Sequence, residues 1–189
     1  WIEYDTFRNI EEVGRGGFSV VYKTSYKRQY ETYEDVAIKI IKDSHKNNQL
    51  FLNELKAYHE LGNYFGISMD KNSGDFILVL NYAEFGSLRE NLVDIFKLEW
   101  KVKLKLLCDI INDLSNIHSK NFIHRNLHPG NILLKGQYEA YIDLGSSISV
   151  DEKQNGIIYG VLPYLAPEKY NRSNKLENIQ KTNNKKLIS

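Results

Sequence analysis

Alternating and continuous apolar positions in the first half of the chain predict β-strands. The segment Val36–Ile41 is rich in β-branched residues, and Phe76–Leu80 is a short uninterrupted apolar run of the kind that forms a buried strand. Between them, residues 48–61 contain neither glycine nor proline and carry apolar side chains at helical spacing. We therefore expect five strands and one helix in the region from about Phe7 to Leu80.

Residues 99–119 carry the clearest helical pattern of the chain. Their apolar side chains recur in alternating steps of four and three residues, which places them on one stripe of an α-helix. We expect this stripe to face a core, and we expect its histidine to be a packed core residue rather than a ligand. The residues on the stripe are Trp100, Leu104, Leu107, Ile111, Leu114 and His118.

Shorter elements are expected around this helix. Ser87 is a favourable N-cap for a short helix that would run to Phe96. Two short strands are expected at residues 132–134 and 140–142. Residues 169–189 are rich in Asn and Lys and show no sustained period, so we expect this tail to be mostly disordered.

Composition and charge narrow the classes of function. The 189 residues fit about one domain, and 42% hydrophobic with 26% charged residues is ordinary for a globular protein. A net charge of +1 gives no reason to expect a nucleic acid or an acidic membrane surface as partner, and no apolar run is long enough to span a bilayer. Cys108 is the only cysteine, which excludes an intrachain disulfide and favours a reducing, cytoplasmic compartment.

A glycine-rich turn is the first candidate for chemistry. Residues 14–21 read Gly-Arg-Gly-Gly-Phe-Ser-Val-Val, and glycines let backbone N–H groups approach phosphates without a Cβ clash. Alone, the segment is explained about as well by a generic turn. Asp35 lies about 20 residues further on, which would also suit a dinucleotide-binding motif. That motif, however, requires a helix directly after the glycines. Residues 24–34 are typical of a hairpin instead, so we reject this alternative.

Further motifs follow the glycine-rich turn along the chain. Val-Ala-Ile-Lys ends at Lys39, and Glu54 lies in the middle of the helix expected next. Residues 124–131 read His-Arg-Asn-Leu-His-Pro-Gly-Asn, and Asp-Leu-Gly follows at 143–145. Ala-Pro-Glu closes the series at 166–168. Each motif is a weak signal alone, but their common order and spacing form a strong one.

In this order, the motifs resemble those of the protein kinase family over about residues 7–168. The resemblance implies an α+β fold with two lobes and a nucleotide between them. The β-rich N-lobe with one helix and the hinge would occupy residues 1–83, and the helical C-lobe would occupy residues 84–168. We expect this C-lobe to be incomplete, because the later helices of the family have no counterpart before the polar tail at 169–189.

The resemblance also implies the roles on the nucleotide side, with ATP and Mg²⁺ as cofactors. Lys39 would contact the α- and β-phosphates and pair with Glu54, while Asp143 and Asn131 would hold the metal. Leu80 would lie at the mouth of the adenine pocket, before a hinge at residues 81–83. The implied cofactor-binding residues are Gly14, Gly16, Gly17, Ser19, Val21, Ala37, Lys39, Leu80, Asn81 and Ala83.

The acceptor side departs from the family pattern at three positions. Asn126 stands at the position of the catalytic aspartate, and an amide cannot take a proton from a substrate hydroxyl near neutral pH. His128 stands where Ser/Thr kinases usually carry a lysine, and Val161 replaces a threonine expected to bond the base and that lysine. We therefore expect Mg-ATP binding, an unidentified protein substrate or partner, and impaired protein phosphorylation.

Two alternatives remain open at this stage. One is a weakly active Ser/Thr-type kinase, which Tyr164 before Ala-Pro-Glu favours over a tyrosine kinase. The other is a truncated, non-enzymatic interaction module that has no nucleotide site.

Overall fold

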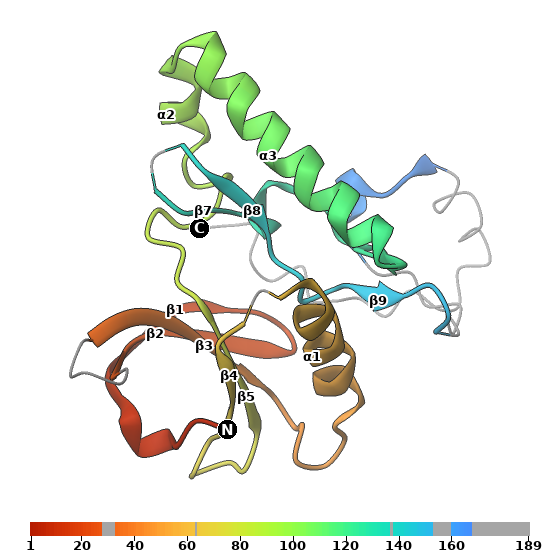
Figure 1. The fold of residues 1–189 in the computed structure, drawn as a ribbon. Coiled ribbons are helices and arrows are strands. Elements are labelled where there is room, and N and C mark those ends of the chain that lie inside the picture. The colour runs from red at the N-terminus through yellow and green to blue at the C-terminus, as the bar shows by residue number, and fades with distance from the viewer. Residues whose placement is uncertain (28–32, 63, 137, 153–159, 168–189) are drawn as a thin grey trace.

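A five-stranded antiparallel sheet with one helix beside it is followed by a second part built around a long helix (Figure 1). The computed structural model describes residues 1–27, 33–62, 64–136, 138–152 and 160–167. This arrangement confirms the expected α+β fold with a β-rich N-lobe and a helical C-lobe. The tail expected at 169–189 lies outside the described residues.

The sheet has the strand order β1-β2-β3-β5-β4, so β3 and β5 lie inside it. A short 3₁₀ turn, η1, leads into the sheet. The bounds are η1 (Tyr4–Thr6), β1 (Phe7–Arg15), β2 (Ser19–Lys27), β3 (Tyr33–Ile41), β4 (Gly66–Met69) and β5 (Phe76–Asn81). Val36 and Ile38 of β3 pack with Ile77 and Val79 of β5 on one face. The intervening residues of both strands face a second core, which explains why their sequences read as continuous apolar runs.

That second core connects the two parts of the molecule. Its members include Ala37 of β3, Leu78 of β5 and Tyr58 of α1 (Gln49–Leu61), together with Ile117 and Ile142 of the second part. The helix expected between β3 and β5 is therefore confirmed, and it presents one buried face to this core. Because the core is shared, the position of α1 is tied both to the sheet and to the second part.

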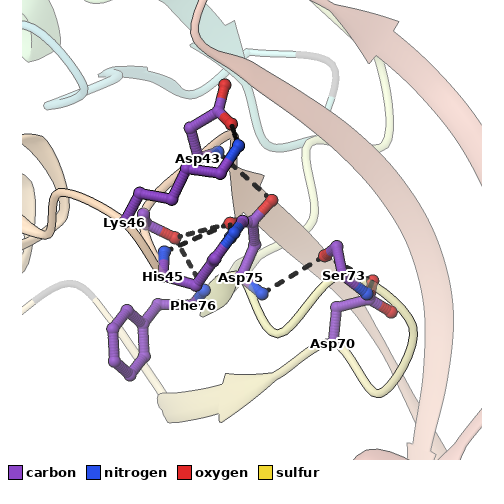
Figure 2. Close-up of polar contacts among 8 residues, drawn as sticks. Asp43, His45, Lys46, Asp70, Ser73, Asp75 and Phe76 are labelled. Atoms are coloured by element: carbon purple, nitrogen blue, oxygen red, sulfur yellow. Dashed lines mark hydrogen bonds and ion pairs between the residues drawn. The ribbon is translucent and has the colours of Figure 1, made fainter.

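A buried carboxylate fixes the loop that leads into α1. Asp75 accepts hydrogen bonds from the backbone N–H groups of Asp43 at 3.2 Å and His45 at 3.3 Å, and His45 Nδ1 lies 2.6 Å from its Oδ1 (Figure 2). Ser44 Oγ accepts a hydrogen bond from the backbone N–H of Phe76 at 2.8 Å. These contacts attach the β3–α1 loop to the start of β5, and so fix where α1 begins.

Where the structure describes it, the second part consists of two helices, short paired strands and two 3₁₀ turns. Strand β6 pairs with β9, and β7 pairs with β8. The bounds are α2 (Leu92–Lys97), α3 (Trp100–Ser119), β6 (Phe122–Ile123), η2 (Pro129–Asn131), β7 (Ile132–Leu134), β8 (Ala140–Ile142), β9 (Ile148–Ser149) and η3 (Leu162–Tyr164). The two strands expected at 132–134 and 140–142 are confirmed. None of the described helices has both the length and the apolar character that a membrane span requires.

The expected start of the short helix was wrong. Helix α2 begins at Leu92, and the preceding residues form turns. In this turn, the backbone N–H and the hydroxyl of Ser87 both donate to Glu90 Oε2, at 2.7 and 2.8 Å, and the backbone N–H of Glu90 donates to Ser87 Oγ at 3.4 Å. A serine followed three residues later by a glutamate is typical of a helix start, but here the same bonds close a turn.

Helix α3 packs on β8 through a face that the sequence pattern did not single out. Leu106 and Ile117 are its buried residues. Asp113 Oδ2 accepts a hydrogen bond from the backbone N–H of Ile142 at 3.0 Å, and Asp109 Oδ2 accepts one from Ala140 at 3.4 Å. Carboxylates on α3 thus satisfy backbone groups of β8 that have no strand on that side.

The expectation that the apolar stripe of α3 faces a core was wrong for most of the stripe, although Leu114 packs against the core that both parts share. Trp100, Leu104, Leu107 and Ile111 are exposed to 68%, 44%, 49% and 63%. His118 is exposed as well, so it is not a packed core histidine. At 3.6 residues per turn, the stripe lies about a third of a turn from the buried face. The periodicity identified the helix correctly, but it could not say which face the neighbouring strands cover.

Candidate functional site

A cavity of about 670 Å³ is lined by residues of both parts of the molecule, a size within the usual range of small-molecule sites. Strands β1, β2, β3 and β5 form one wall, and the segments around β7 and β8 form the other. Of the predicted nucleotide and metal residues, Gly17 does not line the cavity. Those that line it are Gly14, Gly16, Ser19, Val21, Ala37, Lys39, Leu80, Asn81, Ala83, Asn131 and Asp143.

Three charged side chains meet at the inner end of the cavity. Lys39 of β3 lies with its Nζ 2.6 Å from Glu54 Oε1 of α1 and 3.6 Å from Asp143 Oδ2, which follows β8. Lys39 and Glu54 are both buried. One cation therefore lies between two carboxylates that come from separate elements, as the sequence order of the motifs implied.

The carboxylates of Glu54 and Asp143 stabilise the positive charge of Lys39. Burial alone would lower the pKa of Lys39, but the carboxylates of Asp143 and Glu54 outweigh it and raise the pKa above its ordinary value. Burial raises the pKa of Glu54, and the charge of Asp143 adds to that effect. Burial also opposes ionisation of Asp143, but Lys39 and the hydroxyl of Tyr58 lower its pKa. Lys39 and Asp143 are consequently an ammonium and a carboxylate at neutral pH.

The glycine of Asp-Leu-Gly is required by this packing. A Cβ atom built on Gly145 would lie 2.2 Å from Lys39 Nζ and 3.1 Å from Glu54 Oε1. Contacts under 3.0 Å cannot be accommodated unless Lys39 moves. Gly145 thus leaves the space in which the buried ion pair forms.

Asp143 is also held by α1 and by the loop before β7. The hydroxyl of Tyr58 donates to Asp143 Oδ1 at 2.5 Å and accepts from the backbone N–H of Leu144 at 3.3 Å. His124 Nε2 donates to the backbone carbonyl oxygen of Asp143 at 2.6 Å. Sequence reasoning did not give Tyr58 a role in the site. The available signal was its spacing, because a residue four positions after Glu54 lies on the same face of a helix.

Asn131 and Asp143 are suited to a hard divalent cation. The backbone N–H of Asp143 donates to the carbonyl oxygen of Asn131 at 2.9 Å, which brings the two residues side by side. Asn131 Nδ2 donates to the carbonyl oxygen of Asn126 at 2.9 Å, so its Oδ1 is the atom left to act as ligand. Mg²⁺ is commonly held by one or two protein oxygen ligands together with phosphate oxygens and water, and this pair fits that pattern.

The loop at 124–131 places Asn126 beside the segment at 160–167. Asn126 Oδ1 accepts a hydrogen bond from the backbone N–H of Val161 at 3.2 Å, and its Nδ2 lies 3.5 Å from Ser146 Oγ. The preceding Arg125 has a φ of 66°, a conformation that non-glycine residues seldom adopt, and its Nε donates to the carbonyl oxygen of Ser146 at 2.9 Å. The loop is therefore ordered by specific bonds, although its central residue is an amide.

His128 does not supply a positive charge to this region. Burial, and then the nearby Arg89, lower the pKa of His128 below its ordinary value, so the imidazole is neutral at pH 7. Its Nδ1 accepts a hydrogen bond from the backbone N–H of Gly130 at 3.0 Å, and its ring lies 5.7 Å from that of Tyr164. The side chain is engaged in local structure.

Further residues line the cavity that were not predicted, among them Ser87, Glu90 and Tyr141. Glu90 and Ser87 form the hydrogen-bonded turn after β5, on the same side as Ala83. Tyr141, also a lining residue, donates from its hydroxyl to the carbonyl oxygen of Asn81 at 3.4 Å. The sequence pattern predicted Ser87 as a helix N-cap and gave Glu90 no role.

The geometry can now be compared with known proteins. A sequence profile of the protein kinase domain matches residues 7–180 of the chain. The chain belongs to the protein kinase domain family. The match begins where the resemblance was expected to begin, and it extends beyond residue 168, where the resemblance was expected to end.

Similar proteins from other organisms point to the same family. The chain is 29% identical to receptor-interacting serine/threonine-protein kinase 3 of Homo sapiens over 189 residues, covering 92% of this chain and 35% of that protein. It is 29% identical to the probable LRR receptor-like serine/threonine-protein kinase RPK1 of Arabidopsis thaliana over 175 residues, covering 86% and 32%. It is 32% identical to MDIS1-interacting receptor like kinase 2 of the same plant over 177 residues, covering 82% and 16%. The chain thus spans about a third or less of the length of these relatives.

Proposed function

We propose that this protein kinase domain binds Mg-ATP in the cavity between its two lobes and transfers phosphate to a protein hydroxyl poorly or not at all. The observation that carries the proposal is the contrast between two groups of residues. Lys39, Glu54 and Asp143 form a buried charged cluster at the cavity. Asn126, at the position of the base, carries an amide that cannot accept the hydroxyl proton.

On the nucleotide side, each residue has a physical role that its position supports. Val21, Ala37 and Leu80 would bury the adenine ring between apolar walls, and the backbone at 81–83 would meet its polar edge. Lys39 would donate to phosphate oxygens while Glu54 holds its ammonium group in place. Bound Mg²⁺ would neutralise phosphate charge, and Asp143 and Asn131 would supply its protein ligands.

On the acceptor side, the missing group is the proton acceptor. Phosphoryl transfer forms a bond between the substrate oxygen and the γ-phosphorus while the bond to the β,γ-bridging oxygen breaks, and the hydroxyl proton must leave. A positioned general base contributes about 10²–10⁴-fold to such steps. Asn126 cannot supply that contribution, and the neutral His128 supplies no counter-charge to the transferred group.

The test is nucleotide-dependent thermal stabilisation combined with a phosphotransfer assay. ATP with Mg²⁺ should raise the melting temperature, and Lys39→Ala should abolish the shift. Lys46→Ala is the matched control, because Lys46 is an exposed lysine of the same region that pairs only locally with Asp43. Little or no label should move from γ-labelled ATP to a generic protein substrate. Absence of any ATP-dependent shift in the folded wild type would contradict the proposal and favour a non-enzymatic module.

A weakly active serine/threonine kinase is the second candidate. It is favoured by the similarity to serine/threonine-protein kinases of Homo sapiens and Arabidopsis thaliana, and by the ordered geometry around Asn126. Slow phosphotransfer that disappears in Asp143→Ala would establish it. The same assay therefore separates the two candidates, since only the second predicts label transfer that depends on Asp143.

A further inference from the structure

Tyr58 was not among the predicted site residues, but its hydroxyl contacts Asp143 of the candidate metal site. Tyr58 lies on α1 one turn after Glu54, and its ring is buried in the core that both lobes share. Its hydroxyl donates to Asp143 Oδ1 at 2.5 Å and accepts from the backbone N–H of Leu144 at 3.3 Å. One side chain of α1 therefore bonds both the carboxylate and the backbone of the Asp-Leu-Gly motif.

We propose that Tyr58 is a positioning residue that orients the Asp143 carboxylate for Mg²⁺, so that α1 controls metal binding as well as the Lys39–Glu54 ion pair. This inference rests on the proposed Mg-ATP site. Tyr58 lines the cavity, and the proposed role acts through its hydrogen bond to Asp143.

The contacts of the carboxylate show how the orientation is fixed. Oδ1 accepts from Tyr58 and lies 3.4 Å from the backbone N–H of Gly145, while Oδ2 lies 3.6 Å from Lys39 Nζ. Each carboxylate oxygen has two lone pairs, so these contacts leave acceptor capacity for a cation. They also prevent free rotation about the last side-chain bond. Hydrogen bonds of this kind to a metal ligand commonly change metal affinity by about 10–100-fold.

The hydroxyl contributes something that packing alone does not. A phenylalanine ring at position 58 would fill the same core volume, whereas a buried hydroxyl is costly unless it is bonded. Here the hydroxyl is bonded, as a donor to Asp143 Oδ1. It also accepts from the backbone N–H of Leu144, so both of its described hydrogen bonds go to the Asp-Leu-Gly motif.

The position of Tyr58 on α1 couples two events. Glu54 and Tyr58 lie on the same face of the helix, and both face groups at the inner end of the cavity. A displacement of α1 would separate Glu54 from Lys39 and Tyr58 from Asp143 together. The β3–α1 loop, which Asp75 holds in place, sets the start of this helix. A change in this loop would therefore affect both contacts.

The experiment compares ATP affinity with and without Mg²⁺ in Tyr58→Phe, Tyr64→Phe and the wild type, measured by calorimetry over a range of Mg²⁺ concentrations. Tyr64 is the matched control because it packs against the same core and its hydroxyl bonds His59 instead of Asp143. We expect Tyr58→Phe to need about 10–100-fold more Mg²⁺ for half-maximal ATP binding, with Mg²⁺-free ATP affinity within about twofold of wild type. Tyr64→Phe should change neither quantity.

The outcomes separate this inference from the function on which it rests. A folded Tyr58→Phe variant with the Mg²⁺ dependence of the wild type overturns the role of Tyr58 and leaves the Mg-ATP site intact. ATP binding by the wild type that ignores Mg²⁺ overturns the role as well. A folded wild type that binds no ATP overturns both proposals.

A second measurement covers the case in which Tyr58→Phe does not fold. 3-Fluorotyrosine placed at position 58 of the full chain keeps the hydroxyl, and its ¹⁹F resonance reports on the bond to Asp143. We expect this resonance to shift on adding Mg²⁺ to the ADP complex, while fluorotyrosine at position 64 does not respond. A resonance at position 58 that is insensitive to Mg²⁺ overturns the proposal.

Discussion

Asn126 Oδ1 accepts a hydrogen bond from the backbone N–H of Val161, at 3.2 Å. The two residues that replace an expected aspartate and threonine are therefore bonded to each other. The bond uses a backbone donor, so it needs no hydroxyl at position 161. It also uses the one atom that an amide and a carboxylate have in common, an acceptor oxygen. The loop at 124–131 thus keeps its geometry while it lacks a base.

Replacing this amide by a carboxylate should restore activity without disturbing the fold. In Asn126→Asp, one carboxylate oxygen can keep the bond from Val161 N–H, and the other can accept from Ser146 Oγ, which now lies 3.5 Å from Nδ2. We expect phosphotransfer to rise by about 10²–10⁴-fold, measured with γ-labelled ATP. Asn112→Asp, an exposed change of the same kind on α3, should have no effect. An unchanged rate in folded Asn126→Asp would place the defect elsewhere.

The space at Gly145 gives a prediction for stability. In Gly145→Ala, the new Cβ would lie 2.2 Å from Lys39 Nζ, so the buried ion pair with Glu54 must shift. We expect a loss of about 1–3 kcal/mol in the free energy of unfolding, measured with urea. Gly17→Ala is the control, because its Cβ would meet no atom within 4 Å, and it should stay within about 0.5 kcal/mol of wild type. Equal stabilities of the two variants would contradict the crowded geometry.

The two faces of α3 can be distinguished by making the same leucine-to-alanine substitution on each face. Leu106→Ala removes a buried side chain that packs with Ile132 and Leu134, and should cost about 2–5 kcal/mol in the free energy of unfolding. Leu104→Ala is the same change on the exposed stripe of the same helix, and should cost less than about 1 kcal/mol. Chemical denaturation measures both. A larger loss for Leu104→Ala would mean that the stripe, and not the face that carries Leu106, supplies the packing of α3.

Acid should weaken the attachment of the loop before α1. Burial alone would raise the pKa of Asp75, but hydrogen bonds from His45 and the backbone outweigh it and lower the pKa below 3.8. A lowered carboxyl pKa stabilises the fold above the pKa of the unfolded chain, and this contribution is lost as pH falls through the folded pKa. In urea unfolding, Asp75→Asn should therefore be less stable than wild type near pH 6. The difference should shrink as pH falls below about 4.

The control for this pH dependence is an exposed carboxylate. Asp94→Asn changes a residue of α2 whose only described ion pair is with Lys97 on the surface. Its stability relative to wild type should vary little between pH 6 and 3. A constant difference between wild type and Asp75→Asn over the same range would show that the Asp75 contacts do not depend on its charge.

The motifs and most element positions could be predicted from the sequence. Strands β3 and β5 are apolar on both faces because a core covers each face of the sheet at these strands, and such runs are visible locally. The ion pair between Lys39 and Glu54 follows from motif order, since the family pattern relates distant positions. By contrast, the start of α2 was misplaced because the bonds between Ser87 and Glu90 close a turn as readily as they cap a helix.

By itself, the sequence determined the family, part of the cavity lining and the amide that stands in place of a base at Asn126, because these depend on residue identity and order along the chain. Only the tertiary structure decided which face of α3 is covered, and that Tyr58 bonds Asp143 across 85 positions of sequence. Helical periodicity states that an apolar face exists, but the neighbours that cover it come from elsewhere in the chain. For the same reason, the sequence pattern predicts only a core residue at Tyr58, because the partner of its hydroxyl lies far along the chain.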